Sequence, residues 1–153
     1  MMQWYKEDIE QYLNAKEYVD TVIIPLQPFH LSHDKELLKD SFLRQALSIY
    51  ANEIEQELSG RVFLTPEYNY LKSSQLENEV TRINNWVQDI KKQPFQSVFY
   101  LTFDIAWRKV ESDLNGELIW LPGISSGDLQ AKETVSMIQN QVTQISELIK
   151  SYW

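Results

Sequence analysis

The segment Val22-Ile23-Ile24-Pro25-Leu26 decides the fold, because it is a nearly continuous run of apolar, mostly β-branched residues. A run without polar alternation is typical of a strand that is buried on both faces of a parallel sheet. Pro25 has no backbone N–H to donate, which indicates the edge of a sheet or the end of a strand. The segment therefore predicts a buried strand with helices packed around it.

Helical and strand patterns alternate on both sides of this run. Tyr5, Ile9, Tyr12 and Leu13 fall on one face of a short leading helix. Downstream, apolar residues at helical spacing predict helices over 38–58, 76–90, 104–112 and 128–152. Short β-rich runs predict strands over 61–64, 97–103 and 117–121, and 65–73 is expected to be irregular.

Four strands separated by helices predict a single domain over residues 1–153. Its fold class is α/β: an open, doubly wound domain with a mainly parallel sheet of about four strands and helices on both faces. An alternative joins the third and fourth strands as a hairpin, with 104–112 extended. Ile105, Ala106 and Trp107 are apolar in succession, which is not the alternation of a half-buried strand and favours the helix.

The composition excludes several classes of site. The chain has no cysteine, which removes disulfides, thiolate zinc sites, iron–sulfur clusters and cysteine nucleophiles. It has only four glycines, where average usage of roughly 7% would give about eleven. A Walker P-loop and a Rossmann phosphate fingerprint are both absent, so neither type of nucleotide site is expected.

The charge and the N-terminal sequence bear on partners and location. The protein is acidic, with a net charge of −8, and its sequence contains no local basic patch, so we expect no nucleic-acid partner. The start of the chain has neither the basic residues nor the apolar run of a signal peptide, and no apolar stretch approaches the roughly 20 residues of a membrane span. We expect a cytoplasmic protein with no membrane insertion.

The connections predict where a ligand would bind. In open α/β sheets, ligands bind outside the carboxyl ends of the strands. In this chain these ends correspond to 27–33, 65–73, 102–104 and 122–128. Because the basic residues in or beside these segments are few and scattered, they do not predict a phosphate-bearing ligand.

Three residues are candidate metal ligands. His30 and His33 are the two histidines of the chain, and Asp34 follows them directly. Two imidazoles and a carboxylate would suit zinc or another divalent ion with an open position. The alternative interpretation is that Ser32 or Asp34 caps the following helix and the histidines lie in its solvated first turn. No cofactor is expected otherwise.

Two further positions could carry chemistry. Asp104 follows the third predicted strand, where a carboxylate can hold a metal or abstract a proton, and it is also an ordinary helix cap. The stretch 123–127 matches Gly-x-Ser-x-Gly, the pattern of a nucleophile elbow. No histidine follows Ser125 in the sequence, so the alternative of a plain loop or cap is favoured.

The chain ends are rich in aromatic residues. Trp4, Tyr152 and Trp153 either pack back onto the domain or contribute to a partner surface, because tyrosine and tryptophan are frequent in interface hot spots. We take these three as the candidate partner-binding residues.

Three segments together resemble a known family: 16–29, with the sequence KEYVDTVIIPLQPF, 98–102 with Trp107 following, and 116–122, with the sequence GELIWLP. They look like the YpiF-type family of small uncharacterised proteins from Bacillus-like bacteria. The resemblance implies a cytosolic bacterial domain and transfers no catalytic motif.

The absence of a complete catalytic set favours a non-catalytic accessory factor that binds a protein partner or self-associates. One alternative is a small metal-dependent hydrolase that uses His30, His33 and a carboxylate of Asp34 or Asp104, in which the ion lowers the pKa of a bound water. Another alternative is a domain that binds a small neutral ligand without turnover.

Overall fold

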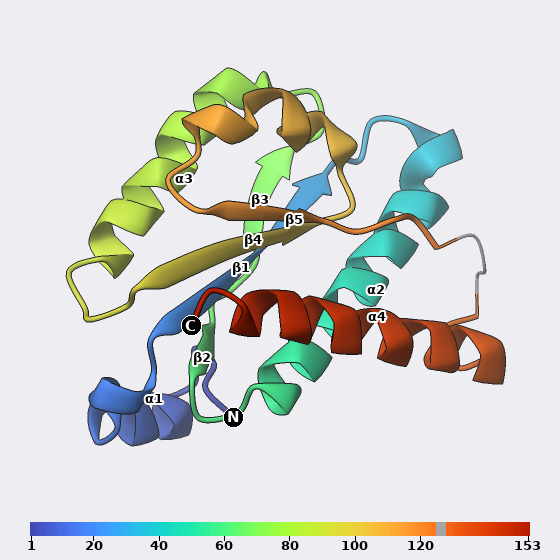
Figure 1. Ribbon diagram of the computed structural model, residues 1–153. Coiled ribbons are helices and arrows are strands. Elements are labelled where there is room, and N and C mark those ends of the chain that lie inside the picture. The colour runs from blue at the N-terminus through green and yellow to red at the C-terminus, as the bar shows by residue number, and fades with distance from the viewer. Residues whose placement is uncertain (125–127) are drawn as a thin grey trace.

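The computed structural model describes residues 1–124 and 128–153, and its centre is a parallel sheet (Figure 1). Its strands are β1 (Thr21–Phe29), β2 (Val62–Leu64), β3 (Tyr68–Leu71), β4 (Ser97–Thr102) and β5 (Glu117–Trp120). The strand order is β2-β1-β4-β5, and β3 also pairs with β1. All four strand pairings are parallel.

Helices cover both faces of the sheet (Figure 1). They are α1 (Lys6–Leu13), η1 (Lys16–Tyr18), α2 (Asp34–Glu57), α3 (Leu76–Ile90), η2 (Ile105–Asp113) and α4 (Lys132–Lys150). One core contains side chains of α1, α3 and η2, and the other contains side chains of α2 and α4. The predicted open, doubly wound α/β fold is confirmed.

Strand β1 divides its side chains between the two cores. Val22, Ile24 and Leu26 belong to the core beneath α3, whereas Ile23 belongs to the core beneath α2 and α4. All four are at most 1% exposed. Successive side chains of a strand point to opposite faces, so a strand covered on both faces must be apolar at every position. This requirement explains the uninterrupted apolar run in the sequence.

The prediction for Pro25 is wrong, because this residue lies inside a central strand. β1 has β4 on one side, where Pro25 is in register with Leu101. On the other side its neighbour changes: the last pair with β2 is Ile23 with Leu64, and the first pair with β3 is Leu26 with Tyr68. Pro25 therefore lies at the gap between two partner strands, where a missing N–H breaks no ladder.

The stretch 65–73 also differs from its prediction, because it contains the strand β3 and raises the number of strands to five. β3 alternates buried and exposed residues, as expected for a short strand with one covered face. Tyr68 and Tyr70 are the buried positions. Four residues are too few for a clear period, which is why the pattern was not detected.

The helical connection between the third and fourth predicted strands is confirmed. η2 lies between β4 and β5, and these two strands pair in parallel, which excludes a hairpin. Asp104 caps the start of η2 by accepting a hydrogen bond from the Ala106 backbone N–H (3.0 Å).

The amino end of the sheet is closed by the C-terminal residues. The Trp153 indole donates a hydrogen bond to Thr21 Oγ1 (2.9 Å), and the Arg61 guanidinium stacks 3.5 Å above the Trp153 ring. Arg61 also pairs with Asp20 (2.6 Å). Tyr152 packs edge-on against Phe99 of β4. These contacts attach the C-terminal residues to the sheet and occupy the polar groups at its amino end.

Among the described residues, no helix is long and apolar enough to cross a membrane. Ser125 of the Gly-x-Ser-x-Gly match lies outside the described residues.

Candidate functional site

A cavity of about 290 Å³ lies at the carboxyl ends of β1, β3 and β4. The parallel strands bring Gln27 and Pro28 of β1 beside Tyr70 of β3, and Asp104 follows β4. The remaining lining residues come from α2, from the segments after β3 and after β4, and from the start of α3 and of η2: Lys39, Asp40, Leu43, Lys72, Ser74, Leu76, Phe103 and Ala106. Three of the four segments that were predicted to form a ligand face contribute to this lining.

A second cavity, of about 340 Å³, adjoins the first. Both cavities are lined by Gln27, Pro28 and Asp40, so they lie on two sides of the same residues. The second is mainly apolar, and its hydrocarbon comes from Phe29, Leu31, Leu37 and Leu38. Together the two cavities form a cleft between the carboxyl end of β1 and the first turns of α2.

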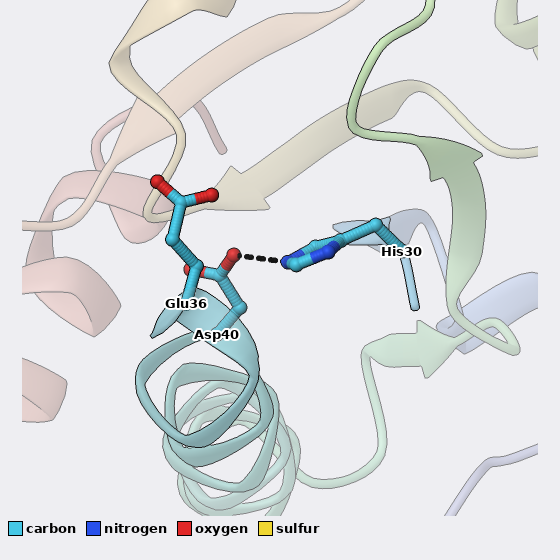
Figure 2. Close-up of side chains that lie close together, drawn as sticks. All are labelled: His30, Glu36 and Asp40. Carbon is cyan, nitrogen blue, oxygen red and sulfur yellow. Dashed lines mark hydrogen bonds and ion pairs between the residues drawn. The ribbon is translucent and has the colours of Figure 1, made fainter. Parts of the chain in front are cut away.

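Charged side chains converge on Lys72 beside this cleft. The Lys72 ammonium donates to Asp40 Oδ2 (2.7 Å) and to Glu36 Oε2 (3.1 Å). Asp40 Oδ2 also accepts a hydrogen bond from His30 Nε2 (2.8 Å). Figure 2 shows His30 pointing from the end of β1 toward the two carboxylates of α2. Asp40 is thus the centre of the network.

The network perturbs the ionisation of its members. Burial alone would raise the pKa of Asp40, but hydrogen bonds and charges from Lys72 and His30 outweigh it and hold this pKa below its usual range. The hydrogen bond to Asp40 raises the pKa of Lys72, and Glu36 adds to this effect. Asp40 is therefore ionised and Lys72 protonated across the neutral pH range.

Three residues of this network also meet some requirements of a metal site. One ligand atom each of His30, Glu36 and Asp40 lie within 4.8 Å of one another, close enough for one cation. The Lys72 ammonium already forms ion pairs with both carboxylates at hydrogen-bond distance. A metal on His30 Nε2 would shift the ring proton to Nδ1, which is buried without a partner among the described residues. The arrangement fits an ion-pair network better than a metal centre.

The candidate metal ligands predicted from the sequence are only partly together. The His30 and His33 rings are 5.7 Å apart between centroids, but His33 is exposed and hydrogen-bonds Ser32 Oγ (2.9 Å). Asp34 begins α2 and is exposed. Among the described residues, the group that could hold an ion combines His30 with Glu36 and Asp40 instead.

Asp104 lies in the wall of the first cavity within a fixed hydrogen-bond chain. The buried Trp107 indole donates to the Tyr70 hydroxyl (2.9 Å), which in turn donates to Asp104 Oδ2 (2.6 Å). Burial, together with the charge of Asp104 and the hydrogen bond to it, raises the pKa of Tyr70 far above its ordinary value. Tyr70 is therefore a neutral donor that holds Asp104 in one orientation at the cavity wall.

Sequence reasoning missed the roles of Glu36, Asp40 and Lys72. Glu36 and Asp40 are four residues apart on one helix and so share a face, which is a detectable signal. Lys72 directly follows β3, and without that strand nothing in the sequence placed it next to α2.

None of the predicted partner-binding residues lines the two cavities: Tyr152 and Trp153 lie at the amino end of the sheet, and Trp4 follows Gln3, which bridges to Leu64 at the end of β2. Trp4 is 67% exposed, whereas Trp153 is 39% exposed and packs on Arg61. Tyr152 is half exposed and contacts Phe99. Of the three, Trp4 is the one whose ring most fully faces solvent.

Comparisons with known proteins agree with the resemblance noted in the sequence. A family model described as "Protein of unknown function (DUF2487)" matches residues 10–153. The chain is 29% identical to the uncharacterized protein YpiF of Bacillus subtilis (strain 168), over 99% of this chain and 98% of the relative. No solved structure gives a significant match.

Proposed function

Because the chain belongs to the DUF2487 family, whose function is unknown, we propose from its geometry that the domain binds a small neutral ligand in the cleft. The observation that carries the proposal is the cavity of about 290 Å³ at the carboxyl ends of β1, β3 and β4. Ligands of open α/β domains bind at this position, and this volume is near the lower end of the usual range for ligand pockets, about 300 Å³.

The charges that line the cavity support a neutral ligand. Two cations, Lys39 and Lys72, face two carboxylates, Asp40 and Asp104, so the formal charge of the wall cancels. An anionic ligand would meet the carboxylates and a cationic one the lysines. A neutral ligand with hydrogen-bonding groups avoids both penalties.

We propose binding without turnover because the reactive groups of the site already engage one another. His30, Asp40 and Lys72 form one hydrogen-bonded network, and Tyr70 fixes Asp104. Hydrogen bonds donated to a carboxylate oppose its protonation, so carboxylates held in this way are poor general bases.

Screening neutral fragments by ¹H–¹⁵N NMR tests the proposal. We expect shifts of backbone amides around the cavity, and their loss in Ala106→Leu, which adds three carbons to the cavity wall. Ala131→Leu is the matched control, because Ala131 is also half-buried but precedes α4. Shifts that persist in Ala106→Leu, or no shifts from any fragment, would contradict the proposal.

The metal-dependent hydrolase remains a second hypothesis, favoured by the approach of His30, Glu36 and Asp40. Titration with Zn²⁺ and Mn²⁺ tests it. Stoichiometric binding that Asp40→Asn abolishes would favour the hydrolase, whereas no thermal shift with either ion would remove it.

The protein-binding or homo-oligomeric accessory factor also stays a prediction. Light scattering over a concentration series is its test. A mass that rises to that of a dimer, and returns to the monomer in Trp4→Ala, would favour self-association through the N-terminal aromatic residues.

A further inference from the structure

We propose that the ligand is a neutral amphiphile, with a polar head in the first cavity and an apolar tail in the second. This inference rests on the proposed function and adds the chemical class of the ligand. The polar head would lie beside Tyr70 and Asp104, and the tail would lie between Phe29 and Leu38.

The two cavities are continuous. Gln27, Pro28 and Asp40 line both, so a molecule that fills the first reaches the second at these residues. The two differ in chemistry. Tyr70, Lys72 and Asp104 bring polar groups to the first cavity, whereas most of the surface of the second is hydrocarbon, although Ser41, Arg44 and Asn69 also line it. Such a two-part cleft matches a molecule with a polar and an apolar part.

Several apolar side chains around the second cavity are exposed to solvent. Leu38 is 86% exposed and Leu31 is 75% exposed, and both line this cavity together with the half-exposed Phe29. Leu71, also exposed, is in register with Phe29 on the neighbouring strand. Single exposed leucines are ordinary, but several around one hollow mark a binding surface. A hydrocarbon tail in the groove would remove these side chains from water.

The first cavity offers both an acceptor and a donor to the polar head of the ligand. Asp104 accepts hydrogen bonds from Tyr70 and from the Ala106 backbone N–H, and a carboxylate has about four acceptor sites. It can therefore accept another hydrogen bond from a ligand N–H or O–H. Lys39 is exposed at the same cavity and can donate to a ligand carbonyl. A primary amide offers both groups without a net charge.

A series of linear primary amides tests the tail. Butanamide, hexanamide and octanamide share one head, and NMR titration of the full chain measures the dissociation constant of each. If every added methylene enters the apolar groove, binding should tighten roughly three- to fourfold per methylene, and on the order of 100-fold from butanamide to octanamide. The shifts should extend from residues beside Asp104 to those beside Leu38 as the tail grows.

A second series tests the head at constant tail length. Octanamide should bind at least tenfold more tightly than octanoate or protonated octylamine. An octanoate or octylamine affinity equal to that of octanamide would overturn the neutral head.

A matched pair of variants tests the location of the tail. Leu38→Gln should weaken octanamide severalfold and leave butanamide unchanged. Leu13→Gln is the control, because Leu13 is also exposed but lies on α1.

If butanamide shifts the cavity residues but octanamide binds no more tightly, or if Leu38→Gln has no effect, the amphiphile is excluded while the proposed function stands. If no amide shifts any residue of the first cavity and the neutral fragments also fail, both are excluded.

Discussion

The two ends of the sheet use the same kinds of residue for different purposes. Each end holds an aspartate paired with a basic side chain from a neighbouring segment: Asp20 with Arg61 at the amino end, and Asp40 with Lys72 at the carboxyl end. At the amino end Arg61 also stacks on the Trp153 ring, so the aspartate, the arginine and the tryptophan form one packed group. At the carboxyl end the pair borders two cavities.

The difference indicates that the two ends of the sheet have different roles, one in stability and one in binding. The amino end joins the C-terminus to the first strand, and its contacts stabilise the fold. At the carboxyl end the strands stop at different points, so side chains from β1, β3 and α2 surround a space that they do not fill. Polar groups there are available for binding.

The largest effect is expected from removing one hydroxyl at the carboxyl end. Tyr70→Phe leaves the buried Trp107 indole without its acceptor and Asp104 without one donor. An unsatisfied buried donor costs about 1–3 kcal/mol, so we expect a loss of roughly 2 kcal/mol in urea unfolding. Tyr18→Phe, at an exposed tyrosine, is the control and should change the unfolding free energy by less than about 0.5 kcal/mol. Equal effects of the two substitutions would show that the hydroxyl chain is not structural.

The amino end should respond less strongly but independently. Trp153→Ala removes the hydrogen bond to Thr21 and the stacking on Arg61, which together stabilise the fold by about 1–2 kcal/mol. Thermal or urea unfolding measures the loss, and Trp4→Ala is the control because that ring faces solvent. The two ends would prove coupled, contrary to our expectation, if Trp153→Ala also weakened ligand binding in the cleft.

The pH dependence of stability tests the charge network around Asp40. The pKa of Asp40 is lowered in the folded protein, so its contribution is complete above its unfolded value of 3.8 and is lost as the pH falls through the folded pKa. The stability advantage of the native protein over Asp40→Asn, about 1 kcal/mol at pH 7, should therefore shrink below about pH 4. Asp89→Asn, which removes one carboxylate from an exposed ion pair, is the control. A constant difference between native protein and Asp40→Asn from pH 7 to pH 2 would contradict the role assigned to Lys72 and His30.

The smallest effect on stability is expected at the apolar rim of the cleft. Leu38→Gln changes a side chain that is almost fully in water, so the free energy of unfolding should change by less than about 0.5 kcal/mol. Together with weaker octanamide binding, this result would assign Leu38 to binding rather than to folding. A loss above 1 kcal/mol in urea unfolding would instead make Leu38 part of the core.

Much of the fold could be predicted because its signals are local. The apolar run of β1 and the helical spacing of α2 and α3 each lie in one continuous segment. The position of Asp104 after β4 is also local, and its capping role follows from it. Periodicity detects such features because each depends on the burial of a single element.

The parts that could not be predicted depend on pairings between distant segments. Pro25 is acceptable in a central strand only because β2 ends and β3 begins beside it. The charge network joins Asp40 to Lys72, which is 32 positions away, through a strand too short to show its period. Hydrophobic patterning carries no information about which strand lies next to which.

The change of partner at Pro25 also affects how the protein resists aggregation. A long unpaired strand edge can template the addition of another chain. Here the edge beside β1 is divided between a strand of three residues and one of four. The N-terminal segment further covers β2 through a bridge between Gln3 and Leu64. An incoming strand therefore finds no continuous row of free backbone groups along this edge, because β2 ends before β3 begins.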